Sequence, residues 1–180
     1  MRPTNANDST HARLRSAPLA AAFHIALVEP EIPPNTGNIA RLCAATQSPL
    51  HLIGKLGFSL DAHAVRRAGL DYWDLVQVHT HETLAQAEHF ISQQGTGRSW
   101  LFSGKSARSY LDVAFTPGDT LVFGKESCGL EDRLLAERPD QVLAIPTSGA
   151  VRSLNLANSV AIALFEALRQ SGSLANASLK

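Results

Sequence analysis

The feature that most restricts the possible folds of this chain is the alternation of short apolar runs with longer segments of helical periodicity. Six runs are short and apolar enough to be buried strands: 24–28, 50–53, 75–78, 100–102, 121–123 and 142–145. Helical segments are expected at about 35–47, 62–67, 84–91, 131–137 and 153–169. This alternation predicts an α/β domain with a mostly parallel sheet and helices on both faces.

Composition narrows the class of protein. The chain has 180 residues, of which 44% are hydrophobic and 18% charged, so we expect one globular domain. A net charge of +0 argues against a general nucleic-acid coat protein but allows a local basic patch. The two cysteines, Cys43 and Cys128, predict neither a disulfide framework nor a zinc site, and a cytoplasmic location fits them. The histidines show no metal-ligand spacing, and those at 79 and 81 are expected at an exposed strand end.

The N-terminus superficially resembles a secretory signal. Arg13 and Arg15 precede a mostly apolar run at 17–28, but His24 interrupts the run and Glu29 follows it directly. We therefore expect residues 1–22 to be a mobile extension and the end of the run to be the first strand. No stretch is long enough to span a membrane.

The stretch from Ile145 to Asn158 joins the last strand to the last helix. Ser153 and Asn155 are both good N-cap residues, and apolar residues then recur at helical spacing: Leu156, Val160, Leu164 and Leu168. Free N–H groups at such a helix start suit a polar or anionic ligand, although an ordinary strand-to-helix connection is the alternative.

Small residues also follow two other predicted strands, after Phe102 and after Phe123. Ligands of parallel α/β sheets bind beyond the carboxyl ends of the strands, so these two loops and the loop after Ile145 are expected to converge on one pocket. Neither Gly95-Thr-Gly97 nor 103–106 has the spacing of a dinucleotide fingerprint or a P-loop.

Three prolines, at positions 30, 33 and 34, are expected to delay the second element until Asn35 or Thr36 caps a helix. In that helix Arg41 lies about 200° round from Ile39, so its side chain is expected to point away from the core.

Three stretches together resemble the SPOUT superfamily of methyltransferases: EPEIPPNTGNIAR at 29–41, LVFGKESCGL at 121–130, and 145–158. Within it the chain most resembles the small, single-domain TrmL (YibK) type, which RRAGLDY at 66–72 also fits. The resemblance covers about 23–170, one SPOUT domain, and leaves 1–22 and a tail at 171–180 outside. It implies a C-terminal trefoil knot, which the strand and helix pattern alone does not predict.

The resemblance also implies an activity and its participants. These enzymes transfer a methyl group from S-adenosylmethionine to the ribose 2′-oxygen of the wobble nucleotide of tRNA, a cytidine or modified uridine at position 34, here expected in leucine isoacceptors. They work as homodimers through the knot helices. The residues that match the family's cofactor contacts are Gly104, Gly124, Ile145 and Ser153.

Arg41 matches the arginine to which the family assigns the chemistry. Because arginine stays protonated in proteins, stabilising a developing alkoxide or gripping a phosphate suits it better than acting as a base. Asn35, Asn155 and Glu126 each have two interpretations: helix-start residues only, or substrate-side and catalytic residues. Lys125 and Cys128 depart from the proline and the basic residue expected in this loop.

RNA binding is expected to use basic side chains that contact phosphates and aromatic side chains that stack on bases. The candidates are Arg66, Arg67, Lys105, Arg108, Arg152, Tyr72 and Trp73. Three alternatives stay open at this point: a methyltransferase of another tRNA or ribosomal RNA site, an inactive RNA-binding protein of this fold, and an ordinary nucleotide-binding α/β domain.

Overall fold

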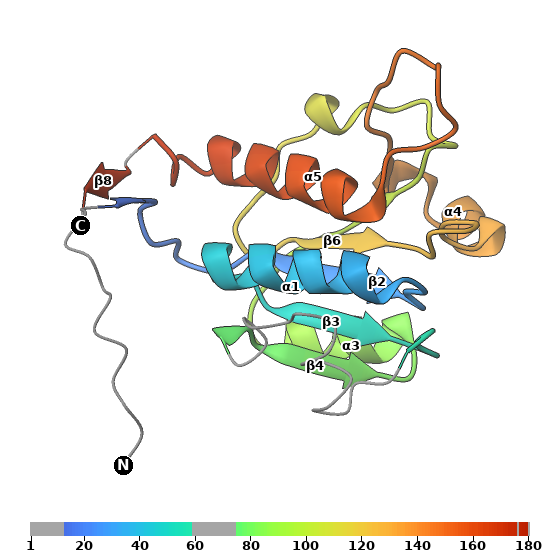
Figure 1. Cartoon of the computed structure of the whole chain (residues 1–180), viewed down its shortest axis with the longest axis horizontal. Helices are drawn as coiled ribbons and strands as arrows, with labels where there is room; N and C mark the ends of the chain where they lie inside the picture. The colour runs from blue at the N-terminus through green and yellow to red at the C-terminus, as the bar shows by residue number, and fades with distance from the viewer. Residues whose placement is uncertain (1–12, 59–74, 176, 180) are drawn as a thin grey trace.

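Six parallel strands form the centre of the molecule, in the order β4-β3-β2-β6-β5-β7 (Figure 1). The computed structural model describes residues 13–58, 75–175 and 177–179. The strands are β2 (His24–Val28), β3 (Leu50–Ile53), β4 (Val78–His81), β5 (Ser99–Phe102), β6 (Thr120–Phe123) and β7 (Val142–Leu143). Every neighbouring pair is parallel, which confirms the predicted class.

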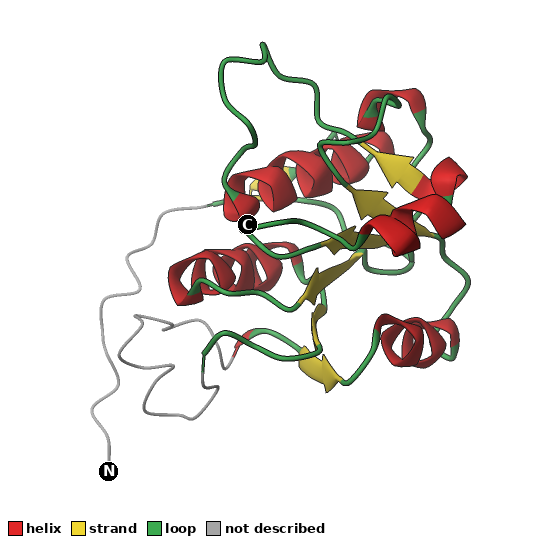
Figure 2. Cartoon of the chain, turned by 90° about the vertical axis from the view of Figure 1, so that its right-hand side faces the viewer, coloured by secondary structure: helices red, strands yellow, loops and turns green. Residues whose placement is uncertain are grey.

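Helices cover both faces of this sheet (Figure 2). One core layer lies between the sheet and helices α1 (Pro33–Thr46) and α5 (Leu156–Gln170). The other lies between the sheet and helices α3 (Leu84–Ser92) and α4 (Asp132–Glu137). Adjacent strand residues alternate between the layers: Leu121 and Phe123 face α1 and α5, while Val122 faces the other side. Among the described residues, no helix is both long and apolar enough to cross a lipid bilayer.

Helix α1 begins earlier than the prolines suggested. Pro33 and Pro34 occupy its first positions, so the expectation that they delay the helix to Asn35 was wrong. The first helical residues make no intrahelical N–H bond, and the fixed φ of proline suits that place. The N-cap residue is Ile32, whose side chain gives no capping bond. Neither Asn35 nor Thr36 is therefore the cap of this helix.

The edge strand also differs from its prediction. We expected it at 75–78, but β4 spans Val78–His81, and the side chain of Leu75 is 71% exposed. Parallel pairing with β3 sets this register, with Leu50 opposite Val78 and His51 opposite His79. The apolar pair at 75–76 therefore lies before the sheet rather than in it.

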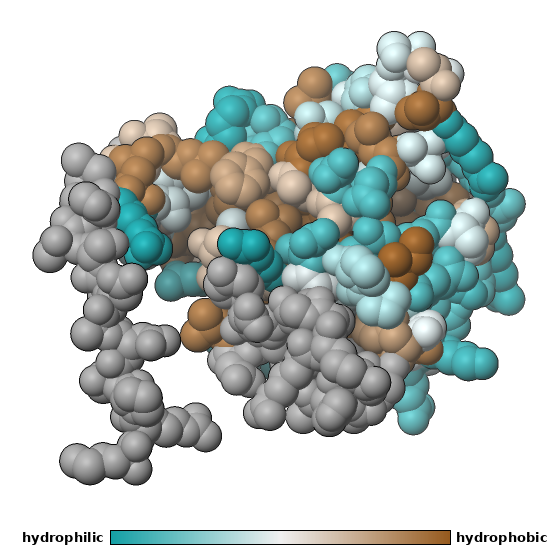
Figure 3. All heavy atoms as spheres, in the orientation of Figure 1, coloured by the Kyte–Doolittle hydropathy of each residue, from teal (hydrophilic) through white to brown (hydrophobic). Residues whose placement is uncertain are grey.

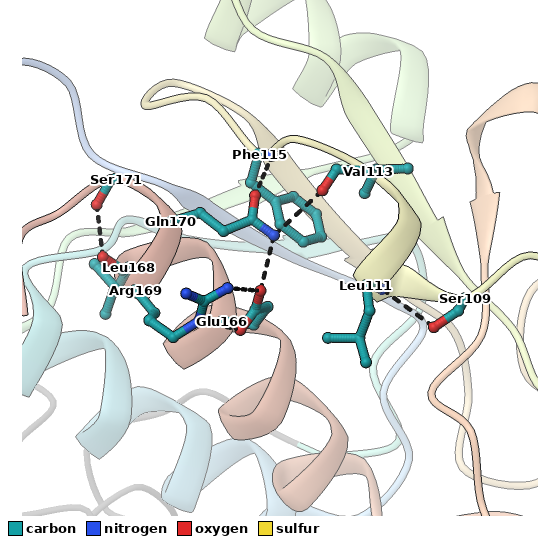
Figure 4. Close-up of polar contacts among 9 residues, drawn as sticks. All are labelled: Ser109, Leu111, Val113, Phe115, Glu166, Leu168, Arg169, Gln170 and Ser171. Carbon is teal, nitrogen blue, oxygen red and sulfur yellow. Dashed lines mark hydrogen bonds and ion pairs between the residues drawn. The ribbon is translucent and has the colours of Figure 1, made fainter.

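Helix α5 matches its prediction closely. Asn155 is its N-cap, and Val160, Leu164 and Leu168 are buried on one face. At its other end, the Gln170 side chain donates to the carbonyl of Val113 at 3.2 Å and accepts from the N–H of Phe115 at 2.8 Å (Figure 4). The last turn of α5 is thus tied to the segment after the 3-10 helix η2 (Tyr110–Asp112).

The two described chain ends lie together, an arrangement that the sequence did not predict. Strand β1 (Leu14–Arg15) pairs antiparallel with β8 (Ser178–Leu179). The N–H of Ala17 donates to the carbonyl of Ser173 at 2.9 Å, and Leu19 packs against the core. The expected domain boundaries at 23 and 170 stay a prediction.

Candidate functional site

The loops that follow β5, β6 and β7 share one edge of the sheet. The order β6-β5-β7 and the parallel pairing put their carboxyl ends side by side, as the sequence predicted. Strand β7 is shorter than expected and ends at Leu143, because Ala144 bridges to Ser109 instead. Ile145 therefore lies half-buried in the loop, and Gly104 is exposed at the same edge. Three of the four candidate cofactor residues, Gly104, Gly124 and Ile145, follow these three strands.

Glu126 is the centre of the polar contacts at this edge. Its carboxylate accepts from the backbone N–H of Glu31 at 2.8 Å and of Ile32 at 3.2 Å. It also accepts from the side-chain amide of Asn35 at 3.0 Å. Helix α1 receives no cap from its own N-cap side chain, so a carboxylate from the β6–α4 loop satisfies N–H groups at its start.

A second bond extends this contact to α5. The side-chain amide of Asn155 donates to the side-chain oxygen of Asn35 at 2.9 Å. The side-chain oxygen of Asn155 accepts from the N–H groups of Ala157 at 2.9 Å and Asn158 at 3.3 Å, so it caps α5 as well. These bonds fix both amide orientations. The oxygen of Asn155 caps α5, so its NH2 group faces Asn35, and the oxygen of Asn35 accepts that bond, so the NH2 group of Asn35 faces the Glu126 carboxylate. The structure thus brings together Asn35, Glu126 and Asn155 in one hydrogen-bonded chain between the starts of α1 and α5.

The two loops also exchange contacts in the opposite direction. The carboxylate of Glu31 accepts from the N–H of Ser127 at 2.9 Å and from its hydroxyl at 3.0 Å. These two bonds hold the pKa of Glu31 below its ordinary value. Lys125 forms an ion pair with Glu29, and this contact raises the pKa of the lysine. In the sequence Glu31 and Ser127 are visible only as members of the two motifs, because nothing in their spacing shows that these loops meet.

The loop after β6 is a tight one. The N–H groups of Lys125 and Gly129 each donate to the carbonyl of the other, at 3.2 and 2.9 Å. A Cβ on Gly124 would lie 2.1 Å from the carbonyl carbon of Gly129, so only glycine fits at this position. A Cβ on Gly104 would meet no atom within 4 Å.

Arg41 lies on the exposed face of α1, as its position relative to buried Ile39 predicted. It follows Asn35 by six residues, which is about 9 Å along a helix. The Glu126 carboxylate holds only the start of α1 against the β6–α4 loop, and Arg41 lies further along the helix.

The candidate RNA contacts are placed unevenly. Arg152 is exposed and donates to the carbonyl of Ser127 at 3.3 Å, so it lies at the same edge, and Ser153 is exposed beside it in the chain. Lys105 is paired with Asp132, and Arg108 donates to the carbonyl of Asp140 at 2.7 Å. Four candidates lie outside the described residues: Arg66, Arg67, Tyr72 and Trp73.

A histidine cluster lies away from this edge, on the α3 side of the sheet. His51 is fully buried, and its two ring nitrogens lie 3.0 Å from His24 and 3.0 Å from His81. It stacks on His79, and Phe90 of α3 packs beside the rings. Burial and the neighbouring rings lower the pKa of His51 to about 3, and burial also lowers the pKa values of His24 and His81.

The expectation that His79 and His81 are exposed was wrong, because both are half-buried in β4. Among the described residues no group of acidic, histidine or cysteine side chains is arranged to hold a metal ion.

Comparison with known proteins decides the family. Residues 22–165 match the SpoU rRNA Methylase family. The chain belongs to this family. The match spans β2 to most of α5 and so includes all three loops of the candidate site.

Two relatives match the chain over nearly their whole length. The chain is 48% identical over 151 residues to the tRNA (cytidine(34)-2'-O)-methyltransferase of Saccharophagus degradans, covering 83% of this chain and 96% of the relative. It is 45% identical over 153 residues to the enzyme of that name from Burkholderia pseudomallei, covering 83% and 96%.

Solved structures share the fold. One that concerns the 2-OH methylation of C/U34 on tRNA is 43% identical, with a TM-score of 0.76 over 83% of this chain and 96% of its own. The SpoU methyltransferase AviRb from Streptomyces viridochromogenes, in complex with AdoMet, is 24% identical, with a TM-score of 0.69 over 86% and 60%.

Proposed function

We propose that this protein is an S-adenosylmethionine-dependent tRNA methyltransferase that modifies the ribose 2′-oxygen of the wobble nucleotide, cytidine or modified uridine 34. The observation that carries the proposal is the junction of the three motif loops through Glu126, Asn35 and Asn155. Relatives that are 45% and 48% identical over nearly their whole length are named for this reaction. The expected tRNA substrates are leucine isoacceptors, and the expected location is the cytoplasm.

The cofactor fits the edge formed after β5, β6 and β7. Exposed backbone at Gly104 and at 146–153 offers hydrogen-bonding groups, and half-buried Ile145 offers an apolar surface. Such a mixture suits a nucleoside that needs both backbone hydrogen bonds and an apolar wall. Gly104, Gly124, Ile145 and Ser153 are assigned to this pocket. When bound there, S-adenosylmethionine supplies an electrophilic methyl group on a positively charged sulfur.

The chain's own task is to present the ribose hydroxyl and to stabilise its negative charge. The residues of the site would hold the ribose 2′-oxygen toward the methyl group that the cofactor would supply, while that oxygen loses its proton. Arg41 is exposed on α1 and permanently charged, so its guanidinium stabilises the developing alkoxide or holds the adjacent phosphate. Glu126 already accepts three hydrogen bonds, which suits holding Asn35 and the α1 start in place better than accepting a proton. Asn35 and Asn155 then orient the ribose side of the site.

RNA contacts and assembly complete the proposal. Arg152 lies next to the Glu126 loop, where an anticodon phosphate would approach, and Arg66 and Arg67 are assigned to tRNA from the sequence alone.

A homodimer forms through α5, whose Ile162 and Phe165 are 38% and 46% exposed. Figure 3 shows hydrophobic residues gathered over α5 on this face. The proposed trefoil knot is supported by the course of α5, which follows edge strand β7 but packs on β6 and α1.

The test is position-mapped mass spectrometry of tRNA nucleosides from cells with and without this protein. We expect loss of a 2′-O-methyl group only at nucleotide 34 of a few leucine tRNAs. Loss at another RNA position would keep the chemistry and overturn the substrate. No loss at all would favour an RNA-binding protein without activity.

A further inference from the structure

The contact between Glu31 and Ser127 is the part of the site that the motif assignments do not explain. We call the contacts of Glu31 with Ser127, and of Glu126 with the N–H groups of Glu31 and Ile32, the loop clamp. In this clamp the β2–α1 loop and the β6–α4 loop each contribute one carboxylate to the other's backbone. The two loops are about 95 residues apart in the chain, so no local interaction holds them together.

The two halves of the clamp hold different things. Glu126 reaches Asn35 and the start of α1, whereas both oxygens of Glu31 are occupied by a single residue, Ser127. Two bonds from one carboxylate to one residue fix the direction as well as the distance of the loop. Ser127 directly follows Glu126, and its carbonyl accepts from Arg152. Ser127 therefore links the Glu31 carboxylate to its neighbour Glu126 and, through Arg152, contacts the 146–153 loop.

We propose that Glu31 is a positioning residue. Through Ser127 it holds the β6–α4 loop against the start of α1, so that α1, which carries Arg41, keeps a fixed position relative to the loops assigned to S-adenosylmethionine. This inference rests on the proposed function. Among the described residues, no hydrogen bond or ion pair joins Glu31 to a predicted cofactor residue. Its effect therefore reaches the reaction through Ser127. Small displacements of reacting groups cost large factors in rate, which makes such a contact matter for turnover.

The test uses the variants Ser127→Ala and Glu31→Ala in the full-length protein. Alanine at position 31 removes both acceptor oxygens, so both Ser127 bonds are lost. Glu31→Gln is the matched control, because its amide oxygen can accept from the Ser127 N–H and its amide nitrogen can donate to the Ser127 hydroxyl. With saturating S-adenosylmethionine and a leucine tRNA, we expect the single-turnover methylation rate to fall by about tenfold or more in each alanine variant. We expect the dissociation constant for S-adenosylmethionine alone, measured by calorimetry, to change by less than about threefold, since the pocket residues themselves are intact.

Matched variants make the result specific. Ser127→Thr keeps the hydroxyl and the N–H and should retain the wild-type rate. The double variant Glu31→Ala/Ser127→Ala should be no slower than the worse single variant, because both changes remove the same contact. Additive losses, or equal factors lost in rate and in cofactor affinity, overturn the positioning role.

Two failures are distinguishable. If the wild-type protein methylates nucleotide 34 and the variants match it, only the inference is overturned. If the wild-type protein methylates no tRNA, the proposed function falls and the positioning role falls with it. Hydrogen exchange adds a readout without activity: the Ser127 amide should exchange faster in Glu31→Ala, which removes its acceptor, and unchanged exchange overturns the clamp.

Discussion

The side-chain amide of Asn155 donates a 2.9 Å hydrogen bond to the side-chain oxygen of Asn35, which lies 120 residues earlier in the chain. This bond joins the starts of α1 and α5, the two helices that share one face of the sheet. Because the other atoms of both amides are already bonded, each amide has only one orientation that satisfies all its partners.

The first prediction follows from that orientation. Asn155→Asp keeps the oxygen that caps α5 but removes the donor, so an oxygen of the new carboxylate faces the oxygen of Asn35. Turning the Asn35 amide would only move the clash to Glu126. We expect the melting temperature to fall by a few degrees, because two acceptor oxygens then face each other, and tRNA methylation to fall by about tenfold or more. In the control Asn155→Ser the cap is kept without a repulsive charge, and a smaller loss is expected. Equal losses in the two variants would contradict the network.

The second prediction concerns Arg41. Arg41→Ala should leave the affinity for S-adenosylmethionine unchanged and reduce the methylation rate by about 10²-fold or more, because charge stabilisation in the transition state is lost. Arg41→Lys should recover part of the rate, since a point charge remains without the planar donors of arginine. Calorimetry and single-turnover assays measure the two quantities. Loss of cofactor binding in Arg41→Ala would show that its role is different.

The third prediction separates two glycines of the same site. Gly124→Ala places a methyl group 2.1 Å from the backbone of Gly129, so the loop must move. We expect the free energy of unfolding to fall by about 1–3 kcal/mol and cofactor binding to weaken strongly. Gly104→Ala meets no atom within 4 Å and should unfold like the wild type. Denaturant titration of both variants checks this, and equal stabilities would argue against the observed loop geometry.

The fourth prediction is acid sensitivity from the histidine cluster. Folding lowers the pKa of His51 from 6.5 to about 3, so below pH 6.5 the unfolded chain binds a proton that the folded protein excludes. Stability is therefore full above pH 6.5 and falls as the pH decreases toward 3. For His51 alone the loss is about 1.4 kcal/mol per pH unit, or about 2 kcal/mol at pH 5. Urea titrations at pH 7.5 and 5 measure it. His51→Gln should flatten the dependence, and an unchanged slope would assign the effect to other groups.

The fifth prediction tests the dimer. A charge at Phe165 on the outer face of α5 would have to be buried in the proposed interface, so Phe165→Glu should shift the protein to a monomer. Light scattering after size exclusion measures the mass. Ala85→Glu, on the exposed face of α3, is the control and should leave the mass unchanged. A wild-type monomer, or a dimer in both variants, would place the interface elsewhere or remove it.

Local patterns predicted the elements well where one residue type has one local meaning. Asn155 was a candidate cap and is the cap, because its preference for a helix start depends on neighbouring N–H groups. The buried strands at 24–28 and 50–53 were found at their true positions, because their apolar runs are complete. Pro33 was misinterpreted, since proline ends one helix and begins another with the same φ. Leu75 was misplaced for a different reason: its register depends on pairing with β3.

The sequence by itself determined the parallel α/β class, the order of its elements and the three motifs that identify the family, because these depend on periodicity and on residue type along the chain. Only the tertiary structure decided which motif residues meet. It placed Glu126 under the start of α1, linked Glu31 to Ser127, and gathered four histidines from three strands into one cluster. Such contacts join residues about 30 to 120 positions apart, and their geometry is set by strand order and register, which no local pattern encodes.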